Sequence, residues 1–251
     1  MLTPSQRDAY LARIAWTGPL RPDAETLQKL HAAHLRSVPF ENLDIHLGTP
    51  ITLDVNRMVE KLVGGRGGFC YELNGAFAAL LRTCGFSVDL LEARVPTAGK
   101  PEVPFDHLCL KVILADPWLA DVGFGACFAE PLPLRSGEDL HDPNGVYRLE
   151  TDAYGWWTLT EDGRVQYRFR LDARLLEEFE PGCRHHQFSA ESHFTRNTVC
   201  SLPTERGRLT LRGDRLIETV DGTKTERVVS ESERAAIYRE RFGLVLARIP
   251  P

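Results

Sequence analysis

The segment 64–74 holds a cysteine in a setting that favours nucleophilic chemistry. Its four glycines predict an irregular loop, and the apolar spacing that follows Cys70 predicts a helix beginning at that residue. The positive end of a helix dipole and the free backbone N–H groups beside it favour a thiolate and can hold an oxyanion. A free cysteine taken alone is more often a small buried hydrophobic residue. The glycine loop therefore singles out Cys70, and the other cysteines are interpreted as structural: Cys84, Cys109, Cys127, Cys183 and Cys200.

A nucleophilic thiol needs a base, and His107 and Asp121 are the candidates for the base and its orienting carboxylate. His107 begins one apolar run, and Asp121 lies in the next, over 118–125. A hairpin across 115–117 would bring both into one sheet, but a turn centred on its middle residue sets His107 opposite Gly125. Contact between the two side chains therefore requires a shifted turn, a bulge or another pairing. Taken alone, such residues are more often hydrogen-bond partners at strand ends.

The composition limits the classes of partner. With 43% hydrophobic residues among 251, the chain can bury a sizeable core without metals or disulfides. The net charge of −5 is spread along the chain, so no surface for nucleic acid is expected. No apolar run approaches the ~20 residues of a membrane span, and the N-terminal residues lack the order of a signal peptide. These features predict a soluble, cytoplasmic protein.

Metal and disulfide sites are not expected. The cysteines are widely spaced and match neither a disulfide framework nor a CxxC pattern. The pair His185 and His186, and His193 with Cys200, follow no zinc spacing and are interpreted as histidines of surface loops.

The hydrophobic periodicity changes once along the chain. Up to Gly85 it is helical, with a capping box at Thr3 and further helix starts expected at Asp23, Asp54 and Cys70. Short alternating runs then predict an antiparallel sheet or barrel, with strands over 88–95, 108–114, 118–124, 147–151, 156–159 and 165–171. Later strands are expected over 198–202, 209–211, 216–220 and 225–228, before a last helix capped by Ser230 and Glu233.

Three motifs resemble one enzyme family in content and order. They are Val-Pro-Phe-Glu-Asn-Leu at 38–43, Arg-Gly-Gly-Phe-Cys-Tyr-Glu-Leu-Asn at 66–74 and Asp-Val-Gly-Phe-Gly at 121–125, with His107 between the last two. These blocks are similar to those of the arylamine N-acetyltransferases, and a weaker block over 193–201 agrees. The resemblance covers most of the chain.

The resemblance implies an α+β fold in three parts. A helical N-terminal domain over 1–85 would carry the nucleophile, and a central antiparallel β-barrel over 86–195 would carry the histidine and the aspartate. A C-terminal α/β lid of sheet and helix would follow over 196–251. Cys70, His107 and Asp121 would form a thiol triad arranged like that of papain-type proteases and transglutaminases.

The implied activity is a ping-pong acetyl transfer of the kind used in xenobiotic metabolism. Acetyl-coenzyme A would acetylate Cys70, coenzyme A would leave, and an arylamine or arylhydrazine would attack the thioester, with His107 moving protons in both halves. No metal cofactor is implied.

Further residues match the family pattern outside the triad. The positions expected to line an aromatic acceptor pocket are Phe40, Tyr71, Phe124 and Phe194. The loop residues Thr97, Ala98 and Gly99 are expected near coenzyme A, and Arg66 and Glu41 are expected as charged partners beneath the site.

The chain also departs from the family pattern. Asp106 precedes His107 where many relatives have an uncharged residue, so a second carboxylate is expected to perturb the imidazole or the acceptor pocket. The chain also lacks the interdomain insertion and the long tail of the vertebrate enzymes. Coenzyme A contacts known from the vertebrate enzymes are therefore not carried over to this chain.

Other functions fit the same residues. A macrolactam-forming amide synthase resembles this family and would use the same triad, and genomic neighbourhood would distinguish it. A thiol hydrolase of papain or transglutaminase type would use water or a peptide amine as acceptor, and acetyl-coenzyme A alone would not label it. A catalytically silent binding protein would keep the pocket without turnover.

Overall fold

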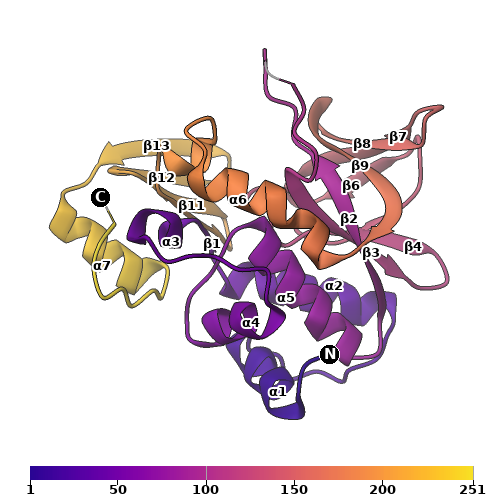
Figure 1. Cartoon of the computed structure of the whole chain (residues 1–251), viewed down its shortest axis with the longest axis horizontal. Helices are drawn as coiled ribbons and strands as arrows, with labels where there is room; N and C mark the ends of the chain where they lie inside the picture. The colour runs from indigo at the N-terminus through magenta and orange to yellow at the C-terminus, as the bar shows by residue number, and fades with distance from the viewer. Residues whose placement is uncertain (100, 251) are drawn as a thin grey trace.

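The N-terminal helices begin where the sequence supplies caps. α1 (Pro4–Arg13) starts at a complete capping box at Thr3, and the carboxylates of Asp23 and Asp54 cap α2 (Ala24–Ser37) and α4 (Val55–Val63). A short α3 (Leu43–Leu47) lies between them, and α5 (Cys70–Thr83) is buried along most of its length. The computed structural model describes residues 1–99 and 101–250. It gathers α1, α2, α4 and α5 at one end of the molecule, whereas α3 lies near α7 (Figure 1).

An eight-stranded antiparallel sheet forms a nearly closed barrel beside the helices. Its strand order is β5-β4-β3-β2-β9-β8-β7-β6, and every pairing within it is antiparallel. The strands are β2 (Ser87–Arg94), β3 (His107–Ile113), β4 (Pro117–Ala120), β5 (Leu132–Pro133), β6 (Asp139–Asp142), β7 (Gly145–Thr151), β8 (Trp156–Glu161) and β9 (Arg164–Arg174). Alternate side chains of these strands fill the interior with a hydrophobic cluster that includes Leu91, Cys109, Tyr147 and Phe169.

The C-terminal part is a second antiparallel sheet with one helix. Its strands are β10 (Val199–Thr204), β11 (Gly207–Arg212), β12 (Arg215–Val220) and β13 (Thr223–Val228), and α7 (Glu231–Arg241) starts at a Ser230–Glu233 capping box. The edge strand β1 (Phe40–Glu41) comes from the N-terminal part, with Phe40 paired to Ser201. The helical domain, the barrel and the sheet-and-helix part confirm the predicted α+β fold class.

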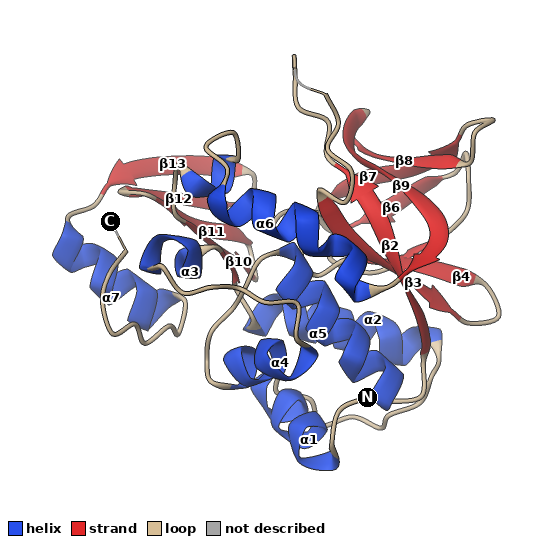
Figure 2. Ribbon diagram, in the orientation of Figure 1, coloured by secondary structure: helices blue, strands red, loops and turns tan. Residues whose placement is uncertain are grey.

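A helix that the sequence analysis did not predict crosses the middle of the molecule. α6 (Glu180–Phe188) follows the 3₁₀ turn η1 (Leu176–Phe179) and precedes a second one, η2 (His193–Thr195). Figure 2 shows α6 passing over α5 between the two sheets. Its residue Cys183 packs in the same hydrophobic cluster as α5. The expectation that His185 and His186 lie in surface loops is therefore wrong, because both belong to α6 and His186 is buried.

Candidate active site

Cys70 is the first residue of α5 and lines a cavity of about 570 Å³. The preceding loop passes so close to its neighbours that side chains do not fit at two positions. A Cβ on Gly67 would lie 1.9 Å from the carbonyl oxygen of Pro39, and one on Gly68 would lie 2.8 Å from the carboxylate of Glu72. That carboxylate accepts the Phe69 N–H at 3.2 Å and so orders the helix start. Gly67 and Gly68 are therefore needed at the loop positions that precede Cys70.

His107 and Asp121 form a direct contact. His107 Nε2 lies 2.7 Å from Asp121 Oδ2, which leaves Nδ1 of the ring available to take a proton. The second carboxylate oxygen, Oδ1, accepts from Asn74 Nδ2 at 2.8 Å and from the Gly123 N–H at 2.9 Å. Burial alone would raise the pKa of Asp121, but His107 and these donors outweigh it and hold the pKa below its usual range. Asp121 is thus an ionised, fully bonded partner of the imidazole.

The register explains how this contact arises. β3 and β4 pair with Ile113 opposite Pro117, so the turn is centred on Ala115 rather than on Asp116. β4 ends at Ala120, and the expected continuation of this strand to Phe124 is therefore wrong. Asp121 lies just outside the ladder, where its carboxylate turns toward His107 and the N-terminal half of α5.

Gly123 and His31 hold the segment after Asp121. A Cβ on Gly123 would lie 2.7 Å from Cys70 Cα and 2.9 Å from its carbonyl oxygen, so this segment packs directly against the start of α5. From α2, His31 Nε2 accepts the Asp121 N–H at 3.2 Å, and its Nδ1 donates to Ala129 O at 3.0 Å. Nε2 also lies 3.2 Å from the Asp121 carbonyl oxygen, and burial lowers the pKa of His31 to about 4, which favours the neutral ring.

The Cys70 thiol is not activated by the helix terminus alone. Cys70 is only 3% exposed. Burial, together with the charges of Asp106 and Asp121, raises the pKa of the thiol well above its ordinary value, although the Leu108 backbone amide lowers it in part. A thiolate therefore requires a proton acceptor beside it, and His107 lines the same cavity.

Three of the four aromatic residues expected in the acceptor pocket line this cavity: Phe40, Phe124 and Phe194. The fourth, Tyr71, is fully buried and donates its hydroxyl proton to Phe105 O at 2.6 Å. It supports the wall behind the cavity and does not line it. Of the residues expected near coenzyme A, Thr97 lines the cavity, whereas Gly99 lies in the same loop away from the lining.

The cavity also has a polar wall, of which the sequence analysis anticipated only Asp106. It consists of Asp106, His185, His186, Ser192, His193 and Arg196. Asn74 and His31 were missed as well, although both bond directly to Asp121. Asn74 could have been found from its position one helical turn after Cys70, because residues four apart share a helix face.

A buried charged network lies beneath the glycine loop. Arg66 donates to Glu41 at 2.8 Å and to Asp44 at 2.8 Å, and Lys61 contacts Asp44 and Glu72, each at 2.7 Å. These are the charged partners expected for Arg66 and Glu41. Because the network joins the loop, α3, α4 and α5, it fixes the position of the loop that carries Cys70.

Residues 1–99 and 101–250 contain no group of three or more His, Cys, Asp or Glu side chains placed to hold a metal ion. No helix in that part of the chain is long and apolar enough to cross a membrane.

Comparison with known proteins agrees with the fold and the motifs. Residues 23–249 match the profile of an N-acetyltransferase family. The chain is 33% identical to the arylamine N-acetyltransferase pineal gland isozyme NAT-3 of Gallus gallus, over 94% of this chain and 93% of that protein. It is also 33% identical to the arylamine N-acetyltransferase of Escherichia coli strain K12, over 94% and 87%.

Solved structures give the same result. The arylamine N-acetyltransferase of Salmonella typhimurium superposes with a TM-score of 0.91 at 30% identity, covering 99% of this chain and 96% of that one. The Mycobacterium marinum enzyme in complex with CoA superposes with a TM-score of 0.87 at 27% identity, covering 94% and 92%. These matches make the chain an N-acetyltransferase, a transferase enzyme. Within that class, it belongs to the arylamine N-acetyltransferase family.

Proposed function

We propose that the protein transfers an acetyl group from acetyl-coenzyme A to arylamines or arylhydrazines through an acetyl-Cys70 thioester. One observation carries the proposal: Cys70 and His107 line the same cavity, and His107 is hydrogen-bonded to Asp121. The CoA complex of the M. marinum relative supports acetyl-coenzyme A as donor. The relatives' names support arylamines as acceptors. Arylhydrazines as further acceptors, and a role in acetylating foreign aromatic amines in the cytoplasm, are part of the proposal.

The first half-reaction acylates the thiol. Cys70 Sγ gives its proton to His107 Nδ1 and attacks the acetyl carbonyl carbon, forming a new C–S bond. Asp121 stabilises the imidazolium through Nε2. The N-cap residue of α5 offers no side-chain hydrogen bond, so backbone N–H groups at the helix start can hold the oxyanion. The intermediate collapses with breakage of the C–S bond to coenzyme A, which leaves with the proton from His107.

The second half-reaction transfers the acetyl group. The amine nitrogen attacks the thioester carbon and gives a proton to His107, and Cys70 leaves as the thiolate and recovers that proton. Phe40, Phe124 and Phe194 offer apolar faces for the aromatic ring of the acceptor. Thr97 lines the cavity and is our candidate contact for coenzyme A.

The proposal is tested by the intact mass of the protein after mixing with acetyl-coenzyme A and no acceptor. We expect a gain of one acetyl group that maps to Cys70 and disappears when an arylamine is added. Cys70→Ala should show no gain and keep its fold by circular dichroism. Cys84→Ala is the matched control, because this half-buried cysteine lies at the far end of α5, and it should acetylate normally.

Two results would contradict the proposal. An unmodified Cys70 in the wild-type protein would contradict acetyl transfer and favour the macrolactam synthase, the thiol hydrolase or a silent relative. A Cys70→Ala variant that still turns over acetyl-coenzyme A with an arylamine would refute the thioester mechanism.

A further inference from the structure

Asp106 puts a second carboxylate into the wall of the acceptor cavity, directly before His107. Its side chain is 15% exposed, and Oδ1 lies 3.1 Å from His186 Nε2. The Val95 N–H donates to Oδ2 at 3.3 Å. Burial alone would raise the pKa of Asp106, but His186 and the Val95 amide outweigh it and lower the pKa. Asp106 is therefore ionised at neutral pH.

A chain of hydrogen bonds fixes this carboxylate. His186 Nδ1 lies 3.1 Å from Ser192 Oγ, which also accepts the Phe194 N–H at 3.2 Å. His186 Nε2 donates to the Asp106 backbone carbonyl at 3.0 Å and also lies beside the carboxylate of the same residue. These contacts hold the carboxylate of Asp106 in the cavity wall, next to His107.

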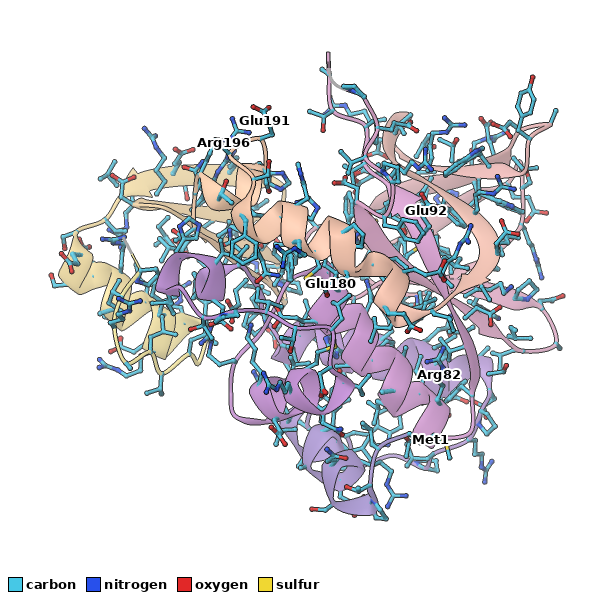
Figure 3. All side chains as sticks on the ribbon, viewed as in Figure 1. Met1, Arg82, Glu92, Glu180, Glu191 and Arg196 are labelled. Carbon is cyan, nitrogen blue, oxygen red and sulfur yellow. The ribbon has the colours of Figure 1, made fainter. Side chains whose placement is uncertain are left out.

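Within residues 1–99 and 101–250, no lysine or arginine forms an ion pair with Asp106. Glu102 lies 3.5 Å from Arg168, and Asp121 is bound to His107. Arg196 donates to the Ser192 carbonyl at 3.3 Å, and Figure 3 labels Arg196 and Glu191 in the part of the chain that follows α6. Two carboxylate charges raise the pKa of the Cys70 thiol, and the charge of Asp106 has a larger effect than the charge of Asp121. Asp106 therefore exerts the stronger electrostatic effect at the sulfur atom that would hold the acetyl group.

We propose that Asp106 is a specificity-determining residue that disfavours acceptors with an anionic ring substituent and favours neutral or cationic ones. The inference rests on the proposed function, because the acceptor has to enter this cavity to reach acetylated Cys70. Two like charges within one half-buried cavity repel each other far more than they do in bulk water. The repulsion penalises the anionic acceptor both in the bound state and in the transition state.

The test compares two acceptors of nearly the same shape but different charge, 4-aminobenzoate and 4-aminobenzamide. For each, kcat/KM is measured with acetyl-coenzyme A at about pH 8, where an ordinary histidine is neutral. We expect Asp106→Asn to raise the ratio of 4-aminobenzoate to 4-aminobenzamide about tenfold over the wild type. Taking the ratio within each protein cancels any general effect of the substitution on acylation. Comparing that ratio between the variant and the wild type cancels the difference in reactivity between the two amines.

A matched variant and the wild type provide the controls. Glu102→Gln removes a cavity carboxylate that already has an arginine partner, and it should leave the ratio within about twofold of wild type. If Asp106→Asn does not fold, the salt dependence of the wild-type protein still tests the inference. Raising the ionic strength from about 0.05 M to about 0.5 M should increase its kcat/KM for the benzoate but not for the benzamide.

The outcomes separate this inference from the proposed function. An unchanged ratio in Asp106→Asn, or identical salt dependence for both acceptors in the wild type, would overturn the role of Asp106. Failure of the wild-type protein to acetylate either acceptor after treatment with acetyl-coenzyme A would instead count against the proposed function.

Discussion

At the scale of single residues, the site combines a buried thiol of raised pKa with an imidazole whose orientation is fixed. In the mechanism that we propose, proton transfer to His107 accompanies attack by Cys70, because burial disfavours a free thiolate. The 2.7 Å contact between Asp121 and His107 Nε2 selects the tautomer that can accept this proton. The proposed chemistry therefore depends on Asp121 as well as on the nucleophile.

Asp121→Asn should slow acylation of Cys70 by about 10²-fold or more while leaving the fold intact. The donors Asn74 Nδ2 and Gly123 N–H require an oxygen at the Oδ1 position, so the new amide NH₂ must face His107 Nε2. Nε2 then has to accept, and Nδ1 carries the proton and cannot take one from the thiol. Stopped-flow measurement of acetyl transfer to the enzyme gives the rate.

The control is Asp152→Asn, which removes an exposed carboxylate on a barrel turn that accepts backbone N–H groups of Tyr154 and Trp156. Its acylation rate should equal that of the wild type. A wild-type rate in Asp121→Asn would show that the carboxylate does not set the tautomer.

At the scale of elements, the site exists because the segment after β4 packs against the start of α5. Gly123→Ala should lower kcat/KM at least tenfold and destabilise the fold by about 2 kcal/mol, since the new methyl group overpacks a filled contact. Its Cβ would meet Cys70 Cα at 2.7 Å, and backbone atoms cannot rotate away as a side chain can. Steady-state kinetics and urea denaturation measure the two effects.

Gly145→Ala provides the comparison for that substitution. Its Cβ would meet carboxylate side chains of Asp162 and Glu161 at 3.3 Å or more, and these can shift by a few tenths of an ångström. This variant should keep near wild-type activity and stability. Equal behaviour of the two alanine variants would contradict a special role for the close approach at Gly123.

The sequence predicted elements well where local signals were strong. Capping boxes and glycine stops located α1, α5 and α7. α6 was missed because its nine residues begin with Glu-Pro-Gly and include two adjacent histidines, so no apolar period marks it. The end of β4 was missed because Val122 and Phe124 continue the alternation of a strand, whereas tertiary bonds at Asp121 draw the chain out of the ladder.

At the scale of the whole molecule, the cavity is built from all three parts of the fold. Cys70 comes from the helical part and His107 from the barrel, while Phe40 belongs to β1, the edge strand of the C-terminal sheet. Arg208 of that sheet bonds the carbonyl of Gly125, beside the catalytic segment. Loss of global stability should therefore abolish the site as a unit.

Two buried histidines of α2 make that stability depend on pH. Burial lowers the pKa of His31 to about 4 and that of His34 to about 3. In the unfolded chain both titrate near about 6.5, so below that pH the unfolded state binds more protons than the folded state. The free energy of unfolding should fall as the pH drops from about 6.5 to about 4.5, by up to about 1.4 kcal/mol per pH unit for each histidine.

Urea denaturation at a series of pH values measures the slope of the free energy of unfolding against pH. A paired substitution then shows how much of that slope comes from His34. His34 Nδ1 bonds the Tyr10 hydroxyl at 3.0 Å, so Tyr10→Phe with His34→Leu removes both partners and leaves no buried polar group unpaired. The double variant should lose the contribution of one proton to the slope over this range. A slope equal to that of the wild type would mean that His34 is already protonated in the folded protein, against its burial beside Phe77.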